Sequence, residues 1–205
     1  MTFSISARCA RTGMFGIAVS SSSPCVAARC AHARAGVGVV ATQNITDPTL
    51  GPRGLDLMAS GLSAQEALAR LQAEAKHLPY RQLALVDRHG GTASFSGAKT
   101  LGTHRTVEGS GAVAAGNLLS SSRVPQAMVD TFAAQSDAAL GDRLIAAMNA
   151  GVSAGGEEGP VHSVGMLLVD KVAWPVADLR VDWHESDPIG ALGDLWELWK
   201  PQMDA

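Results

Sequence analysis

Residues 2–20, TFSISARCARTGMFGIAVS, indicate how the chain begins to fold. In residues 2–8 polar and apolar side chains alternate, which is the pattern of a half-buried strand. Residues 14–20 read as a second strand, apolar and β-branched, and Arg11-Thr12-Gly13 between the two forms a turn. The opening stretch is therefore predicted to be an antiparallel hairpin.

Capping signals and alternation place the remaining elements. Asp47 followed by Pro48 predicts a helix that continues to Gly61, with Asp47 as its cap. Ser63 and Glu66 form a capping box, in which each side chain satisfies a free backbone amide of the other residue. Further helices are predicted at residues 63–76, 124–134, 137–150 and 187–199, and further strands at residues 36–43, 82–87, 92–96, 105–108, 112–116, 162–170 and 174–184.

This order of elements predicts an α+β protein with antiparallel hairpins, because an alternating βαβ chain would place a helix between successive strands. The glycine-rich stretch 152–159 is the longest expected loop, and it is too short for a domain linker. The sequence shows no internal repeat. Residues 1–205 are therefore expected to form one domain.

The composition is that of a globular protein. Of 205 residues, 46% are hydrophobic and 17% are charged, which excludes disorder, collagen and coiled coils. A net charge of -3 argues against nucleic acid as a partner, and no apolar run approaches the roughly 20 residues that span a bilayer. The N-terminus lacks the pattern of a signal peptide. Cys9, Cys25 and Cys30 have neither zinc nor redox spacing, so reduced thiols in a cytoplasmic protein are expected.

Two glycine runs, residues 36–41 and 109–114, match the dinucleotide fingerprint G-x-G-x-x-A. The fingerprint binds a pyrophosphate only where its glycines turn a strand into a helix. Both runs lie inside predicted strands, so small residues at a tight sheet contact are the favoured interpretation. A dinucleotide-binding oxidoreductase that uses NAD or NADP is the competing one.

Other polar residues have simple interpretations beside functional ones. Every second residue from 178 to 184 is polar, namely Asp178, Arg180, Asp182 and His184, so these side chains share one strand face, and the carboxylates and imidazole could bind a metal ion. A solvated face is favoured, because the residues between them are apolar. Glu157 and Glu158 are expected in a solvated turn. The adjacent His162-Ser163 is interpreted as incidental.

Thr2 follows Met1, and methionine aminopeptidase removes Met1 before a residue this small. Processing would leave a hydroxyl and a free α-amine on the same residue. An α-amine has a pKa of about 8 in model peptides, so it can take the hydroxyl proton and activate the nucleophile without a histidine. A nucleophile of this kind sits at the start of a strand, where Thr2 is predicted. The alternative is that Thr2 has no chemical role, as is common at this position.

Several stretches together resemble a bacterial family, namely MTFSI (1–5), SSSSP (20–24), ARCAHARAGVG (28–38), ATQNITDP (41–48), GLSAQEAL (61–68), Gly116-Asn117 and DLRVD (178–182). The family is catalogued as domain of unknown function 1028 and is grouped with the N-terminal-nucleophile (Ntn) hydrolases, relatives of proteasome subunits and penicillin acylases. The resemblance covers nearly the whole chain. It implies a four-layer αββα sandwich, with two antiparallel sheets face to face and helices outside.

The resemblance also implies that Thr2 is the nucleophile, at the edge of the cleft between the sheets. An oxyanion needs amide donors aimed at it. Asn44 and Asn117, each just after a strand, are the expected donors. Ser21 ends the second strand and is expected to hydrogen-bond the amine.

Arg34 and His32 would supply the positive charge that lowers the pKa of the amine and holds a substrate carboxylate. Asp47 would orient them or cap a helix. The chain departs from the family pattern at Ser22, where many members have lysine, at Gly116 preceded by Ala115, where many have glutamine before the asparagine, and at residues 160–163. Arg34 or His32 would have to take the role of the missing lysine.

The expected function is an Ntn-type amidohydrolase that cleaves an amide bond of a small polar substrate, with no metal or organic cofactor. The alternative is a non-catalytic protein that keeps the same fold, retains Met1 and binds a small molecule. Trp196 and Trp199 on the last predicted helix would pack in the core or in a homodimer interface.

Overall fold

The computed structural model describes residues 1–203. The strands are β1 (Thr2–Arg8), β2 (Phe15–Ser21), β3 (Ala31–Arg34), β4 (Gly38–Asn44), β5 (Arg81–Asp87), β6 (Thr92–Ser96), β7 (Arg105–Gly109), β8 (Ala112–Asn117), β9 (Ser163–Val169) and β10 (Ala177–Val181). The α-helices are α1 (Ala27–Cys30), α2 (Leu50–Ala59), α3 (Ala64–Glu74), α4 (Val124–Ala134), α5 (Leu140–Ser153) and α6 (Pro188–Trp199).

The strands of the described residues form two antiparallel sheets. The larger sheet has six strands in the order β10-β9-β2-β1-β8-β7, and the smaller has four in the order β3-β4-β5-β6. In the larger sheet β1 pairs with both β2 and β8, and Thr2 lies opposite Asn117. In the smaller sheet Gln43 lies opposite Gln82. The register therefore places the first residue of β1 beside the last residue of β8.

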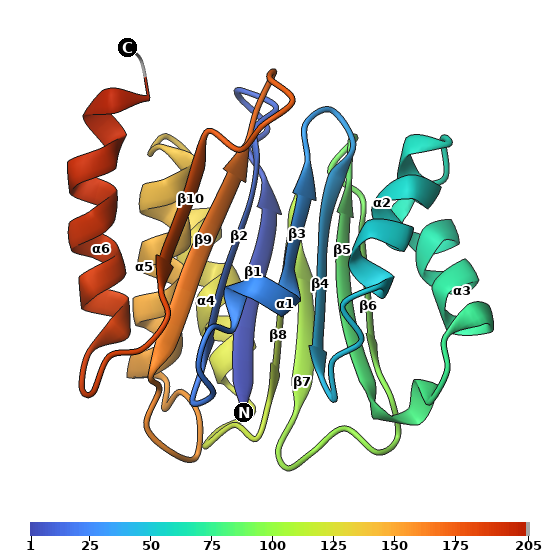
Figure 1. Cartoon of the computed structure of the whole chain (residues 1–205), viewed down its shortest axis with the longest axis horizontal. Helices are drawn as coiled ribbons and strands as arrows, with labels where there is room; N and C mark the ends of the chain where they lie inside the picture. Colours follow the sequence, from blue (N-terminus) through green and yellow to red (C-terminus); the bar gives the residue numbers. More distant parts are fainter. Residues whose placement is uncertain (204–205) are drawn as a thin grey trace.

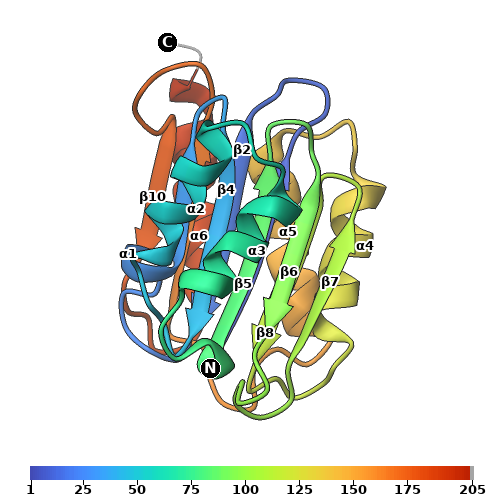
Figure 2. The same ribbon diagram turned by 90° about the vertical axis from the view of Figure 1, so that its right-hand side faces the viewer.

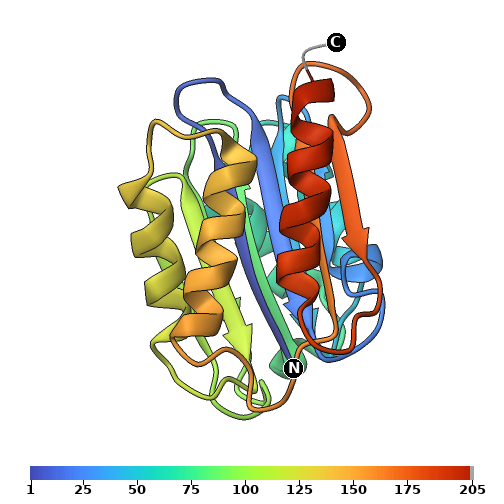
Figure 3. The same cartoon turned by 90° about the vertical axis from the view of Figure 1, so that its left-hand side faces the viewer.

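Helices cover the outer face of each sheet, so the molecule has four layers (Figure 1). The helices α2 and α3 lie over the smaller sheet (Figure 2), and α4, α5 and α6 lie over the larger one (Figure 3). The inner faces of the two sheets pack against each other. The predicted α+β sandwich of four αββα layers is confirmed.

Successive residues of a strand point in opposite directions, one toward the covering helices and the next toward the other sheet. In β1, Phe3 and Ile5 pack in the apolar cluster beneath the helices of the larger sheet. Neighbouring residues of a strand point to opposite faces, so Ser4 and Ser6 face the smaller sheet. The pattern that predicted a half-buried strand thus describes a strand buried on both faces, with serines on the inner one.

Most predicted elements are confirmed. The opening hairpin, the capping box of Ser63 and Glu66, and the hairpin of β5 and β6 are present. The glycine run 36–41 leads from a turn into β4, and the run 109–114 leads from β7 into β8. Neither turns a strand into a helix, so neither forms the dinucleotide fingerprint.

The helix predicted from Asp47 begins instead at Leu50. Asp47 and Pro48 form a turn, in which the Leu50 N–H donates to the Asp47 carbonyl at 3.2 Å. The Asp47 carboxylate accepts a hydrogen bond from the Thr49 N–H at 3.1 Å, one residue before the helix. The elements α1 and β3 were not predicted, because four residues are too few to show a periodicity.

Two further boundaries differ from the prediction. The helix predicted at residues 137–150 spans Leu140–Ser153, so it includes the first part of the expected loop. The last strand ends at Val181 instead of His184, because the chain beyond it bonds to loops: the Asp182 carbonyl accepts from the Cys25 N–H, and the His184 N–H donates to the His162 carbonyl. Within residues 1–203, no helix has both the length and the apolar character needed to cross a membrane.

Candidate active site

Polar side chains gather at one end of the layer between the sheets, around Thr2 at the start of β1. The N-terminus marks this end in Figure 1. Each side chain is at most 7% exposed, although it occupies a strand position on the inner, otherwise largely apolar face. We call this group the polar end; its members are Thr2, Ser4, Ser21, Gln43, Gln82 and Asn117.

Gln82 is the centre of the polar end. Its Oε1 accepts hydrogen bonds from Gln43 Nε2 at 2.8 Å and from Asn117 Nδ2 at 3.0 Å. Its Nε2 donates to Ser96 Oγ and to the Gly116 carbonyl, each at 2.9 Å. Both donors and both acceptor positions of this buried amide are therefore in use.

The network joins the two sheets. Ser4 Oγ in the larger sheet donates to Gln43 Oε1 in the smaller sheet at 2.7 Å. Gln82, also in the smaller sheet, receives Asn117 from the larger one. Fully bonded networks hold their members in one rotamer. The carboxamide of Asn117 is thus fixed beside Thr2, its partner across the strand pair.

Two hydroxyl groups contact one carbonyl group at the start of β1. Thr2 Oγ1 donates to the Met1 carbonyl oxygen at 2.5 Å, and Ser21 Oγ donates to the same oxygen at 2.5 Å. The two hydroxyl oxygens are 3.5 Å apart. Ser21 also contacts Ser23 Oγ at 3.2 Å and accepts the Ser23 N–H at 3.1 Å. The carbonyl oxygen of the Met1–Thr2 peptide bond is therefore held by the hydroxyl groups of Thr2 and Ser21.

Glu157 lies in the loop that joins α5 to β9 and is only 6% exposed. Its Oε2 accepts the Ser22 N–H at 3.2 Å, and its Oε1 has no partner within residues 1–203. Burial raises the pKa of Glu157 to about 7, and the positive charge of the Met1 amino group opposes that rise. The prediction of a solvated turn is wrong for Glu157, because a β-bridge to Leu119 holds the loop against the molecule; it is correct for the exposed Glu158.

Asn44 and Asp47 have partners outside the polar end. Asn44 Nδ2 donates to the Tyr80 carbonyl at 2.5 Å, and Asn44 Oδ1 accepts the Leu101 N–H at 3.2 Å. The Asp47 carboxylate lies 3.7 Å from the Arg81 guanidinium. Both residues therefore organise the loops that follow β4, and the structure does not bring them to Thr2.

His32 and Arg34 lie on the opposite face of the smaller sheet from Thr2. Ala33 between them packs toward the larger sheet, so its two neighbours face α2. The His32 ring lies against Gly51, and Arg34 pairs with Asp56 at 2.9 Å. Burial lowers the pKa of His32, so its imidazole is mainly neutral near pH 7. The positive charge expected near the nucleophile is not supplied from here.

The other polar motifs are accounted for locally. Asp178 pairs with Arg180 at 2.8 Å on the exposed face of β10. His162 Nδ1 donates to the His184 carbonyl at 2.9 Å, so the imidazole does not pair with the adjacent Ser163. Among residues 1–203, no three His, Cys, Asp or Glu side chains are grouped so that they could hold a metal ion.

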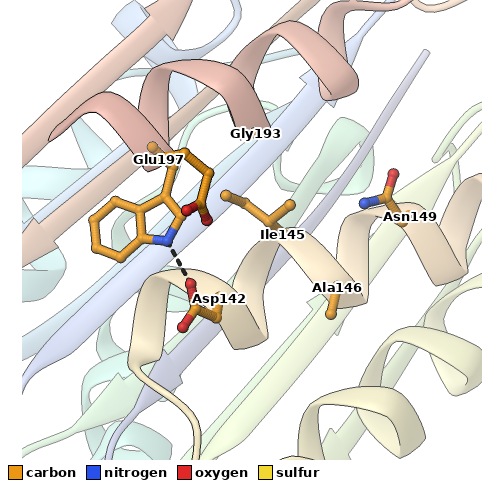
Figure 4. Close-up of a pocket in the computed structure, with 7 residues that line it drawn as sticks. Asp142, Ile145, Ala146, Asn149, Gly193 and Glu197 are labelled. Carbon is orange, nitrogen blue, oxygen red and sulfur yellow. Dashed lines mark hydrogen bonds between the residues drawn. The ribbon is translucent and has the colours of Figure 1, made fainter. Parts of the chain in front are cut away.

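An open groove of about 300 Å³ lies between α5 and α6, in the helix layer over the larger sheet (Figure 4). Trp196 Nε1 donates to Asp142 at 2.6 Å there, and Lys200 pairs with the same carboxylate at 2.7 Å. Trp196 is 2% exposed and packs in the core, whereas Trp199 is partly exposed. Of the two tryptophans, only Trp199 is left for the predicted homodimer interface, which stays a prediction.

Sequence reasoning missed Gln43, Gln82 and Glu157. A signal for the two glutamines exists: each stands two residues from an inward-facing alanine, Ala41 or Ala84, so a polar group falls on an apolar face. Glu157 has no such signal, because a loop over the sheet edge buries it. Of the predicted residues, Thr2, Ser21 and Asn117 do come together.

Comparison with known proteins supports the same overall structure. The family of unknown function DUF1028 matches residues 2–192. The crystal structure of protein SPO2555 from Silicibacter pomeroyi, assigned to DUF1028, has a TM-score of 0.89 and 30% identity, over 96% of this chain and 88% of that one.

A more distant structure, Anbu (ancestral beta-subunit) from Yersinia bercovieri, has a TM-score of 0.40 and 9% identity, over 98% of this chain and 96% of that one. A likeness this low supports no argument. No curated protein matches the sequence. Because the family model matches most of its length, the chain belongs to the family of unknown function DUF1028.

Proposed function

We propose that the chain is an N-terminal-nucleophile hydrolase that cleaves an amide bond of a small substrate, with Thr2 as the nucleophile after Met1 is removed. The observation that carries the proposal is the carbonyl group of Met1, held by Thr2 Oγ1 and Ser21 Oγ at 2.5 Å each. A substrate carbonyl displaced from the Thr2 nitrogen toward Oγ1 would have the proposed nucleophile beside its carbon and Ser21 Oγ within reach of its oxygen.

The free α-amine of Thr2 would act as the base. It accepts the proton of Thr2 Oγ as that oxygen attacks the carbonyl carbon, and the carbonyl π electrons move to oxygen. Ser21 Oγ donates to the resulting oxyanion, as it now does to the Met1 carbonyl. Asn117 is the candidate second donor, since Gln82 fixes its position beside Thr2.

Collapse of the tetrahedral intermediate breaks the C–N bond, and the ammonium of Thr2 gives its proton to the leaving nitrogen. The acyl group then forms an ester with Thr2 Oγ. A water molecule attacks this ester after losing a proton to the α-amine, and the C–O bond breaks as Oγ regains that proton. The amine is thus base and acid in turn, and the two half-reactions consume one water.

Intact mass and chemical labelling test the proposal. The intact mass of untagged protein would be measured before and after treatment with a β-lactone, which acylates an activated hydroxyl. The expected result is loss of Met1 and one adduct that maps to Thr2. A protein that retains Met1 and forms no adduct would contradict the proposal and favour the non-catalytic binding protein.

A further inference from the structure

Met1, the residue that precedes Thr2, is half-buried and lies against the loop between α5 and β9. An ideal Cβ built on Gly159 would lie 3.0 Å from Met1 Cε, so the methionine side chain passes directly over this glycine. Figure 1 shows the N-terminus beside the loop between α5 and β9. This contact and the hydrogen bond from Ser21 to the Met1 carbonyl hold Met1 in position, and we call the space that Met1 fills the Met1 pocket.

Glu157 adds a buried carboxyl group to the Met1 pocket. One carboxylate oxygen is used by the Ser22 N–H, and the other has no partner in the described part of the chain. The amino group of Met1 is close enough to act on this carboxylate electrostatically, without a direct ion pair among residues 1–203. A buried carboxylate with an unused oxygen needs a hydrogen-bond donor, preferably a cation.

The acyl group of Met1 also stands close to where a substrate acyl group would stand. Met1 is bonded to the nitrogen of Thr2, and an acyl-enzyme would be bonded to its Oγ. An acyl group that moves from the nitrogen of Thr2 to its Oγ passes through a five-membered ring, so the two positions are close together. Thr2 Oγ1 already contacts the Met1 carbonyl oxygen. Removal of Met1 therefore frees the space that an aminoacyl group has filled.

We propose that the Met1 pocket is the acyl-binding pocket and that Glu157 selects acyl groups with a free α-ammonium group. The substrates would be amides of amino acids and short peptides with a free N-terminus. An unbranched apolar side chain suits the surface over Gly159, as that of Met1 does. The inference rests on the proposed function for its chemistry, but the selectivity of the pocket can be measured by binding alone.

The test is calorimetric titration of two ligands, L-methioninamide and N-acetyl-L-methioninamide, into full-length Thr2→Ala protein, which cannot hydrolyse them, after its loss of Met1 is verified by mass. Acetylation removes the positive charge and leaves the rest of the ligand intact. L-methioninamide should bind roughly 10-fold more tightly, which corresponds to one charge-assisted hydrogen bond. Glu157→Gln should reduce this preference to about threefold or less, and Glu158→Gln, a matched change of an exposed neighbour, should retain it.

Equal affinity for the two ligands, no binding of L-methioninamide, or a preference that survives Glu157→Gln would overturn the inference. A preparation that retains Met1 would overturn it as well, since the pocket stays filled. Labelling by the β-lactone of protein that retains Thr2 separates the two proposals. Labelling of Thr2 without ligand preference leaves the hydrolase and removes the selectivity, whereas preference without labelling leaves the pocket and removes the catalysis.

Discussion

The two ends of the layer between the sheets are built from largely the same strands and differ in composition. At one end, which we call the apolar end, Phe15 and Ile17 of β2 meet Val39 and Val86 of the smaller sheet in a cluster of apolar side chains. At the other end, Gln82 is the centre of a network of buried amides and hydroxyls, the polar end. Apolar burial stabilises the fold at the first end, whereas hydrogen bonds satisfy buried polar groups at the second.

This difference in composition means that one end of the layer mainly stabilises the fold, whereas the other holds the residues of the proposed reaction. A polar group buried with a partner adds little net stability, but one buried without a partner costs about 1–3 kcal/mol. The polar end is therefore poor at stabilising the fold and good at fixing side chains such as Asn117 in place. Ser6 lies on the inner face of β1 between the two ends, and its hydroxyl has no partner within residues 1–203.

The largest effect is expected at Thr2. Thr2→Ala removes the proposed nucleophile, so acylation by a β-lactone should fall by at least about 10³-fold, while the melting temperature barely changes. Mass spectrometry of the adduct over time gives the rate. Thr12→Ala, in the exposed turn before β2, should label like the unaltered protein. Persistent labelling of Thr2→Ala would show that another residue is the nucleophile.

Phe15→Ala should affect the apolar end alone. The side chain is 2% exposed, and its truncation should lower the free energy of unfolding by about 3–5 kcal/mol through lost burial and a cavity. Urea unfolding measures this loss. The labelling rate of the folded fraction should be unchanged. A slower rate at a temperature where the variant is fully folded would mean that the two ends are coupled.

Gln82→Leu should affect both stability and labelling. It leaves the amide donors of Gln43 and Asn117 without their acceptor, at a cost of about 2–4 kcal/mol in unfolding free energy. Because Asn117 loses its fixed orientation, acylation of Thr2 should also slow. Gln65→Leu is the control, since that glutamine is exposed on α3. A normal labelling rate in Gln82→Leu would remove Asn117 from the proposed oxyanion site.

Glu157 should make stability depend on pH. Burial raises its pKa from 4.5 to about 7, so between these values the folded protein binds more protons than the unfolded chain, and stability falls as pH rises. Glu157→Gln removes this penalty. Its stability relative to the unaltered protein should increase between pH 5 and pH 8 by at most about 3 kcal/mol. Melting temperatures at the two pH values provide the test, and Glu158→Gln should show no such trend.

The smallest effect is expected between the two ends. Ser6→Ala removes a hydroxyl that is buried without a partner, so it should raise the free energy of unfolding by about 1 kcal/mol or leave it unchanged. Ser4→Ala, two residues away on the same face, removes a hydrogen bond to Gln43 and should destabilise by about 1 kcal/mol. Chemical denaturation of the two variants measures the change in the free energy of unfolding that each substitution causes. A clear loss of stability in Ser6→Ala would mean that the hydroxyl is satisfied in solution.

Local signals sufficed for the elements with strong patterns. The opening hairpin follows from alternation, and the helix after Ser63 follows from its capping box. The predicted meeting of Thr2, Ser21 and Asn117 rested on a family resemblance, and the structure brings the three together through the pairing of β1 with its neighbours.

His32 and Arg34 were predicted near Thr2 but face α2 instead. Which face of a strand a side chain occupies depends on what packs against each face. Ala33 turns toward the larger sheet, so both flanking residues turn away from it. The sequence of this short strand shows no alternation strong enough to reveal that choice. Glu157 was missed for a related reason, since a bridge between distant residues buries it.

The sequence by itself determined the order of the elements other than α1 and β3, the opening strand that begins at Thr2 and the alternation of residues along β1. These follow from steric and hydrogen-bonding preferences that act over a few residues. Only the tertiary structure decided that Gln82 and Asn117 share a hydrogen bond and that Glu157 faces the residue before Thr2. Such contacts depend on strand register, on the packing of one sheet against the other and on loop paths, all of which are set by long-range burial of apolar surface.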